Sequence, residues 1–159
     1  MSGERFYSYF DLEQTPCQAH LDKTPQHITL IPPMPLISPE VLNKYTEEAY
    51  RRSRIIGCLS VTLAEQILMG PRKNIPALAV KDHSHKLQSL HEAFMEALRQ
   101  TMPDEKMVPS MYTGSNYVPH STIKGIKNPI KGFQRLESIT ILKSDGQQKI
   151  IHDVIPLSG

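Results

Sequence analysis

Short runs in which apolar and polar residues alternate, or in which β-branched residues cluster, recur along the chain and predict β-strands. Such segments lie at residues 5–10, 27–31, 59–64, 75–80, 116–123 and on both flanks of the SDGQ segment at 144–147. We expect the PPMP segment, residues 32–35, to end the second strand, because proline lacks the N–H that strand pairing uses. The pair Asp145-Gly146 suits a tight hairpin turn between the last two strands.

Two longer segments have the helical period instead. The first begins at Ser38, a good N-cap, with Pro39 at the first helical position, and runs to about residue 54. The second covers residues 84–101 and stops before Pro103. Their apolar stripes are formed by Val41, Leu42, Tyr45 and Ala49 and by Leu87, Leu90, Phe94, Ala97 and Leu98. Strands and helices follow in a similar order in the two halves, which predicts an α+β fold of two related lobes.

Composition excludes some classes of protein but does not identify the function. The chain has 159 residues, 39% of them hydrophobic, which is enough for one domain, 1–159, with a real core. A formal net charge of +2 is too small for a protein that coats long nucleic acid. No apolar run reaches the length of a membrane span or resembles a signal peptide, so we expect a cytoplasmic protein. We expect Cys17 and Cys58 to be reduced thiols.

One short motif occurs twice, as His27-Ile28-Thr29-Leu30 and as His120-Ser121-Thr122-Ile123. Residues i and i+2 of a strand share a face, so each motif would present an imidazole and a hydroxyl together. Two such strands meeting at one cleft suit an in-line displacement at phosphorus. One histidine would act as base and the other as acid, while threonine hydroxyls would hold the non-bridging oxygens.

These paired motifs resemble the signature of the 2H phosphoesterase superfamily, which includes bacterial 2′-5′ RNA ligase-like proteins and 2′,3′-cyclic phosphodiesterases. The segments PQHITLIPP, IPALAVKDHSHKLQSLHEAF, VPHSTI and SITILKSDGQQKIIHDVIPL carry the resemblance over most of the chain. It implies two antiparallel sheets related by a pseudo-twofold axis, with flanking helices and a central cleft. It also implies metal-independent chemistry on a 2′,3′-cyclic phosphate or a 2′-5′ linkage, with no cofactor. Ser121, where an apolar residue is more usual, and the long, irregular segment 11–26 depart from the pattern.

Several other residues have both a functional and a structural interpretation. Lys124 could contact a phosphate, or could be a solvated surface lysine. Tyr117 could stack a base, and ordinary packing competes with that role. The cluster of His83, His85 and His91 lacks the spacing of a metal helix, so we expect no metal site and a packed, hydrogen-bonded His91.

The leading hypothesis is a monomeric enzyme that opens 2′,3′-cyclic phosphates at RNA ends or on nucleotides, with His27, Thr29, His120 and Thr122 as catalytic residues and Lys124 and Tyr117 as weaker binding candidates. A second enzymatic hypothesis is cleavage or joining of 2′-5′ linkages, including cyclic oligonucleotides. The alternative from another class is a catalytically silent protein that binds RNA ends or nucleotides. A histidine-rich metal protein is the remaining alternative, and the sequence does not say which histidine is the base.

Overall fold

The computed structural model describes residues 4–15, 19–21, 23–36, 38–102, 117–145 and 147–157. Its elements follow in the order β1 (Arg5–Asp11), β2 (His20–Leu21), β3 (His27–Pro35), α1 (Pro39–Ser53), β4 (Leu59–Met69), β5 (Ile75–Asp82), α2 (Leu87–Thr101), β6 (His120–Thr122), β7 (Gly132–Leu136), β8 (Ser138–Ser144) and β9 (Lys149–Pro156). Cys17 lies outside the described residues, and Cys58 is a free thiol within them. Neither helix of the described chain combines the length and the apolarity of a membrane span.

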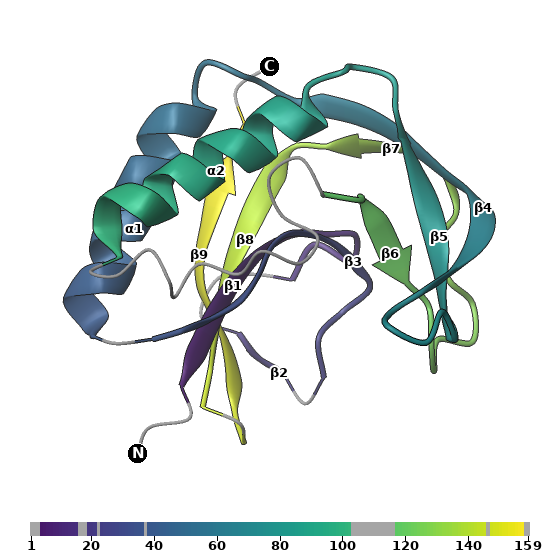
Figure 1. Cartoon of the computed structure of the whole chain (residues 1–159), viewed down its shortest axis with the longest axis horizontal. Helices are drawn as coiled ribbons and strands as arrows, with labels where there is room; N and C mark the ends of the chain where they lie inside the picture. The colour runs from purple at the N-terminus through teal and green to yellow at the C-terminus, as the bar shows by residue number, and fades with distance from the viewer. Residues whose placement is uncertain are drawn as a thin grey trace.

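The strands form two antiparallel sheets, which confirms the predicted bilobal α+β fold. Five strands make the first sheet in the order β2-β9-β8-β1-β3, and four make the second in the order β6-β5-β4-β7. The helices lie together on one side of the molecule and the second sheet lies beside the first (Figure 1). Each sheet therefore carries one copy of the repeated motif on an edge strand, β3 or β6.

One hydrophobic core joins both sheets to both helices. It combines Ile28 and Leu30 of β3 and Leu59 and Val61 of β4 with the buried faces of the helices. The predicted helix starts are close to those observed, and the Val41 N–H donates to Ser38 Oγ at 3.3 Å as an N-cap should. The opposite face of the first sheet carries Tyr7, Tyr9, His27 and Thr29, because strand residues alternate between faces.

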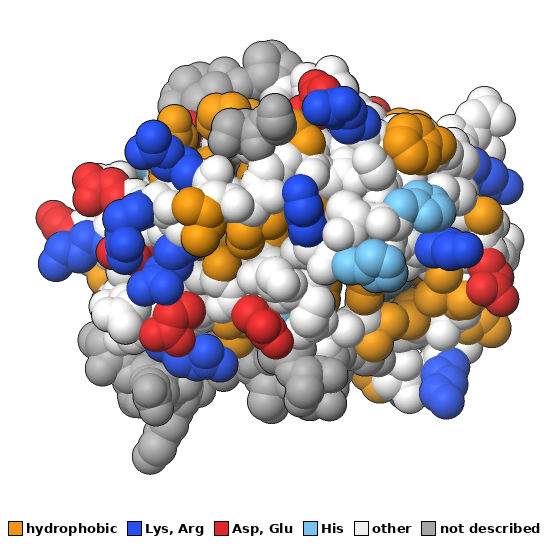
Figure 2. All heavy atoms as spheres, turned by 90° about the horizontal axis from the view of Figure 1, so that it is seen from above, with side chains coloured by type: hydrophobic (Ala, Val, Ile, Leu, Met, Phe, Trp, Pro, Cys, Tyr) orange, Lys and Arg blue, Asp and Glu red, His pale blue; other side chains and the backbone are white. Residues whose placement is uncertain are grey.

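The outer surface of the helices carries charges of both signs. Figure 2 shows Lys and Arg side chains interspersed with Asp and Glu over this side of the molecule. Some of them are paired along the helices, as Arg51 is with Glu48 at 2.7 Å and Arg99 with Glu96 at 3.4 Å. This side of the molecule therefore presents no continuous basic surface.

The predicted strands differ from the observed ones at β3, β6 and β7, and the two-residue strand β2 was not predicted either. β3 continues through the PPMP segment to Pro35, which an edge strand tolerates because its outer N–H groups need no partner. β6 covers only residues 120–122 of the predicted 116–123, and Asn116 lies outside the described residues. The sequence pattern also missed β7, because its less exposed positions are Gly132, Gln134 and Leu136, only one of them strongly apolar, while the apolar Phe133 is 64% exposed.

The two halves of the sequence do not correspond to the two sheets. The C-terminal hairpin of β8 and β9 was predicted correctly, but it joins the sheet of β1 and β3, while β7 joins that of β4 to β6. The hairpin turn is held by Asp145, whose Oδ1 accepts from the N–H groups of Gln147 and Gln148 at 2.9 and 2.7 Å. Gly146 of the predicted turn lies outside the described residues.

Candidate active site

The two motif strands come together although they belong to different sheets. β3 and β6 are in contact, and Figure 1 shows them side by side where the two lobes meet. Within β3, Ile28 and Leu30 are fully buried while His27 and Thr29 on the other face are half-buried. Within β6, Ser121 is fully buried between His120 and Thr122. The predicted alternation therefore directs the imidazole and the hydroxyl of each motif away from the core.

His27 is held on three sides. Its Nδ1 lies 2.7 Å from the carbonyl oxygen of Pro25, its ring lies 4.8 Å from the ring of Tyr9 between centroids, and Asp11 is its direct partner across the β1–β3 pair. Burial lowers the pKa of His27, and the nearby positive charges of His120 and Lys149 act in the same direction. The Pro25 carbonyl and the Asp11 carboxylate oppose that shift. The charge of His120 thus reaches His27, although the motifs are far apart in the sequence.

His120 repeats one of these contacts. Its Nδ1 lies 2.8 Å from the carbonyl oxygen of Val118, again the residue two positions earlier. A carbonyl oxygen can only accept, so both Nδ1 atoms carry the proton of this hydrogen bond. Each neutral ring therefore has an unprotonated Nε2, ready to accept a proton, and each charged ring has an Nε2–H ready to donate one.

The two threonines differ in exposure. Thr29 is half-buried, directly opposite Tyr9 on β1, and Thr122 is exposed. Thr122 and His27 line the same cavity, of about 700 Å³, together with Lys124. The structure therefore brings residues of both motifs, and one of the weaker binding candidates, to one hollow.

Tyr117, the other binding candidate, makes contacts within the protein. Its ring stacks on His91 at 4.0 Å between centroids and 3° between planes, and its hydroxyl donates to the carbonyl oxygen of Thr29 at 2.8 Å. His91 is fully buried, and its Nδ1 donates to the carbonyl oxygen of Leu30 at 2.8 Å, as predicted for a packed histidine. Tyr117 and His91 thus connect the segment before the second motif to the backbone of the first.

Ser121 shows the effect of a polar residue on the core side. It is fully buried, and its hydroxyl has no hydrogen-bond partner among the described residues. An unsatisfied buried hydroxyl costs about 1–3 kcal/mol. This departure from the usual motif therefore lies on the core side of β6, and the cleft side keeps its histidine and threonine.

Two further histidines of the predicted cluster, His83 and His91, make contacts within the protein. His83 Nε2 lies 2.6 Å from Thr62 Oγ1, its ring stacks on Phe133, and His91 is used as described above. Within the described ranges, no group of three His, Cys, Asp or Glu side chains is placed to hold a metal ion.

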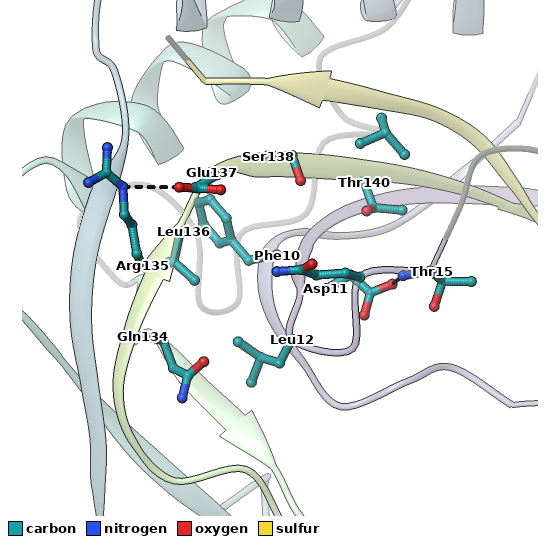
Figure 3. A pocket seen from close by; sticks show the side chains of 12 residues that line it. Phe10, Asp11, Leu12, Thr15, Gln134, Arg135, Leu136, Glu137, Ser138 and Thr140 are labelled. Carbon is teal, nitrogen blue, oxygen red and sulfur yellow. Dashed lines mark hydrogen bonds and ion pairs between the residues drawn. The ribbon is translucent and has the colours of Figure 1, made fainter. Parts of the chain in front are cut away.

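A second cavity, of about 460 Å³, lies between the end of β1 and the β7–β8 connection (Figure 3). It includes Asp11, the residue opposite His27, whose Oδ2 accepts from the Thr15 N–H at 2.8 Å. Arg135 and Glu137 on its rim form an ion pair at 3.1 Å. Asp11 therefore lies between this hollow and the first histidine.

Gln26 is a site residue that the sequence pattern did not reveal. It is 3% exposed, its Nε2 donates to the carbonyl oxygen of Ile130 at 3.0 Å, and its Oε1 accepts from the Ile130 N–H at 2.6 Å. This pair of hydrogen bonds ties the segment after the second motif to the residue before His27. The only indication in the sequence is that a glutamine precedes a motif histidine. This arrangement is too common to identify a site residue.

The known structures share this fold. LigT of E. coli, solved with NADP+, matches with a TM-score of 0.67 at 13% identity over 100% of both chains. TT0787 of Thermus thermophilus matches with a TM-score of 0.69 at 13% identity over 98% of both chains. Usb1 of Kluyveromyces marxianus matches with a TM-score of 0.51 at 11% identity over 97% of both.

Sequence comparison alone reaches none of these proteins. No family profile matches the chain, and no curated protein sequence matches it. The structural match extends over essentially the whole of this chain and of each of the three solved ones. The bilobal fold expected from the resemblance to the 2H phosphoesterase superfamily is therefore confirmed, and the chain has the fold of the LigT and Usb1 structures.

Proposed function

We propose that the protein is a phosphodiesterase of the 2H phosphoesterase superfamily that opens 2′,3′-cyclic phosphates at RNA ends or on nucleotides without a metal. The observation that carries this proposal is the pair of histidines on two meeting strands, each with its Nδ1 donating to a carbonyl oxygen, and the positive charge of His120 is near enough to lower the pKa of His27. LigT, which shares the fold, has been solved with 3′-AMP and with phosphate, ligands of the size and charge that this site would take.

His27 is the better candidate for the base. Its lowered pKa keeps the ring neutral near neutral pH, so that Nε2 can take a proton from water. The oxygen of that water forms a bond to phosphorus, and the bond from phosphorus to one ribose oxygen breaks. His120, in its protonated form, gives the Nε2 proton to that ribose oxygen. The product carries a phosphate monoester on one of the 2′ and 3′ oxygens and a free hydroxyl at the other.

Thr29 and Thr122 would donate hydrogen bonds to the non-bridging oxygens of the phosphate. Charge on these oxygens grows towards the transition state, so fixed donors stabilise the transition state more than the substrate. The contribution depends on a dry, preorganised site, and half-buried Thr29 meets this condition better than exposed Thr122.

The direct test is hydrolysis of a nucleoside 2′,3′-cyclic phosphate in the presence of EDTA. We expect turnover in the unmodified protein, and a loss of about 10²–10⁴-fold in kcat for His27→Ala and for His120→Ala. His85→Ala, a change of the same size at an exposed histidine, is the control. Undiminished turnover in both motif variants would refute the mechanism.

The alternatives are outcomes of the same assay. Preferential turnover of 2′-5′ over 3′-5′ dinucleotides would indicate the second enzymatic hypothesis, with the same four residues. Tight nucleotide binding without turnover of any of these substrates would indicate a binding protein.

A further inference from the structure

The cavity that His27 and Thr122 share extends well beyond the motifs. Neither His120 nor Thr29 is among its lining residues, and its volume of about 700 Å³ exceeds the space that one phosphate group needs. The additional wall comes from Lys23 and Thr24 before the first motif and from residues 124–128 and Ile130 after the second. The hollow therefore continues from the candidate reaction centre to one side of it.

This extension is positively charged. Lys23, Lys124 and Lys127 line it and are exposed, and Glu13 is the single carboxylate among its lining residues. Within the described part of the chain, none of the three lysines has a carboxylate within 4.0 Å. The Glu13 carboxylate accepts from the Gln26 N–H at 2.6 Å, so it is engaged with the backbone. Three ammonium groups around one hollow, without a carboxylate partner among the described residues, favour an anion there.

The position of two of these lysines is set by the fold. Residues 123–126 form a turn closed by the Ile126 N–H donating to the Ile123 carbonyl oxygen at 3.0 Å. Gly125 in this turn has φ of +79°, a value that favours glycine. The far end of the segment is held at Ile130 by the two hydrogen bonds from Gln26. Lys124 and Lys127 thus lie on a short segment anchored at both ends beside His27.

We infer that this lysine-lined extension binds a second phosphate group of the substrate, next to the one between the histidines. The inference rests on the proposed function and narrows its substrate class to nucleotides with a 5′ phosphate as well as the reacting 2′,3′ group. That second phosphate is either a 5′-monoester on a mononucleotide or the next phosphodiester of an RNA chain. A nucleoside cyclic phosphate would leave the extension empty.

Binding tests the inference independently of catalysis. We expect adenosine 3′,5′-bisphosphate to bind at least about fivefold more tightly than 3′-AMP in calorimetric titrations, since hydrogen bonds to charged groups contribute this much. The double variant Lys124→Gln/Lys127→Gln should lose most of this preference, so that its affinities for the two ligands become nearly equal. Circular dichroism would check that the variant is folded.

The matched control removes two positive charges elsewhere. Lys131 follows the same segment without lining the cavity, and Lys44 is exposed on α1, so Lys44→Gln/Lys131→Gln has the same net charge as the test variant. Retention of the preference in this control supports a local site. An equal loss in both double variants, or no preference in the unmodified protein, would overturn the inference.

Turnover measurements then distinguish a 5′-monoester from the next phosphodiester of an RNA chain as the second phosphate. They also test the lysine-lined extension separately from the proposed phosphodiesterase activity. Adenosine 2′,3′-cyclic phosphate, its 5′-phosphorylated form and an adenylyl dinucleotide ending in a cyclic phosphate would be compared by kcat/KM. An advantage of the dinucleotide alone indicates an RNA chain, and an equal advantage of both phosphorylated substrates indicates any 5′ phosphate. A lysine-dependent binding preference without turnover would support the extension and refute the proposed phosphodiesterase.

Discussion

The two copies of the repeated motif have similar sequences, but their histidines have different structural surroundings. His27 lies on a nine-residue strand, against the ring of Tyr9 and opposite Asp11. His120 begins a three-residue strand that ends at the exposed Thr122. Both rings donate Nδ1–H to the carbonyl two residues earlier. The shared part of the motif thus sets the tautomer, whereas the surroundings set how easily the ring takes up a proton.

This difference indicates how one pattern can supply two chemical roles. Burial lowers the pKa of His27, and the positive charge of His120 lowers it further. In an acid–base pair across one phosphate, the group with the lowered pKa is suited to accept a proton and its partner to donate one. The following predictions test this division, in order of decreasing effect.

The largest effect is expected when the leaving group is changed. Thymidine 3′-(4-nitrophenyl phosphate) has a leaving group that needs no proton, so the acid becomes dispensable while the base does not. His120→Ala should then lose less than about tenfold in kcat/KM, and His27→Ala should still lose about 10²–10⁴-fold. The release of 4-nitrophenolate, followed by absorbance, measures both. The opposite ranking would assign the base to His120.

A smaller effect is expected when the connection between the two lobes is cut at Gln26. Gln26→Met keeps the length of the side chain and leaves the Ile130 N–H and carbonyl oxygen without their partner. We expect the free energy of unfolding to fall by about 1–3 kcal/mol and kcat/KM to fall with it, because the segment carrying Lys124 is no longer anchored. Urea denaturation and steady-state kinetics measure the two effects.

The matched control for this variant is Gln134→Met, which removes a glutamine whose side chain makes one long, exposed contact to the Lys131 carbonyl oxygen, at 3.4 Å. It should change the free energy of unfolding by less than about 0.5 kcal/mol. Equal effects of the two substitutions would show that the paired hydrogen bonds of Gln26 have no special role.

The smallest effect is expected at His91, whose ring contacts the Leu30 carbonyl oxygen in the first motif and the ring of Tyr117 before the second. Burial lowers the pKa of His91, with the Leu30 carbonyl opposing the shift, so the unfolded chain binds the proton more readily than the folded one below about pH 6.5. The free energy of unfolding should therefore fall as the pH drops below 6.5, by up to about 1.4 kcal/mol per pH unit for this histidine. His91→Asn should make this dependence shallower in denaturation curves between pH 7 and 5.

His85→Asn is the control for this substitution, because His85 is exposed and its φ of +57° suits asparagine. It should leave the slope unchanged. An unchanged slope in the His91 variant as well would show that the pH dependence arises elsewhere, for example at His27.

Much of the fold could be predicted from local patterns. The helix beginning at Ser38, the alternation of β1 and β4 and the terminal hairpin all follow from short-range chemistry that the structure confirms. The extension of β3 through its prolines could not be predicted, because it depends on β3 being an edge strand. β7 could not be predicted, because its apolar Phe133 lies on the exposed face and its other face carries Gly132 and Gln134, so apolar and polar residues do not alternate with its two faces. Which of the two sheets the β8–β9 hairpin joins depends on contacts between distant parts of the chain.

By itself, the sequence determined the two half-sites: a strand period of two separates His and Thr from the aliphatic residues that attach each strand to the core. The tertiary structure decided that the half-sites meet, since β3 and β6 touch only as edges of two different sheets. It also decided the surroundings of His27, because the pKa of this ring depends on its burial and on the charges of His120 and Lys149, which are remote in sequence. A pKa is a property of surroundings, and surroundings exist only once the chain has folded.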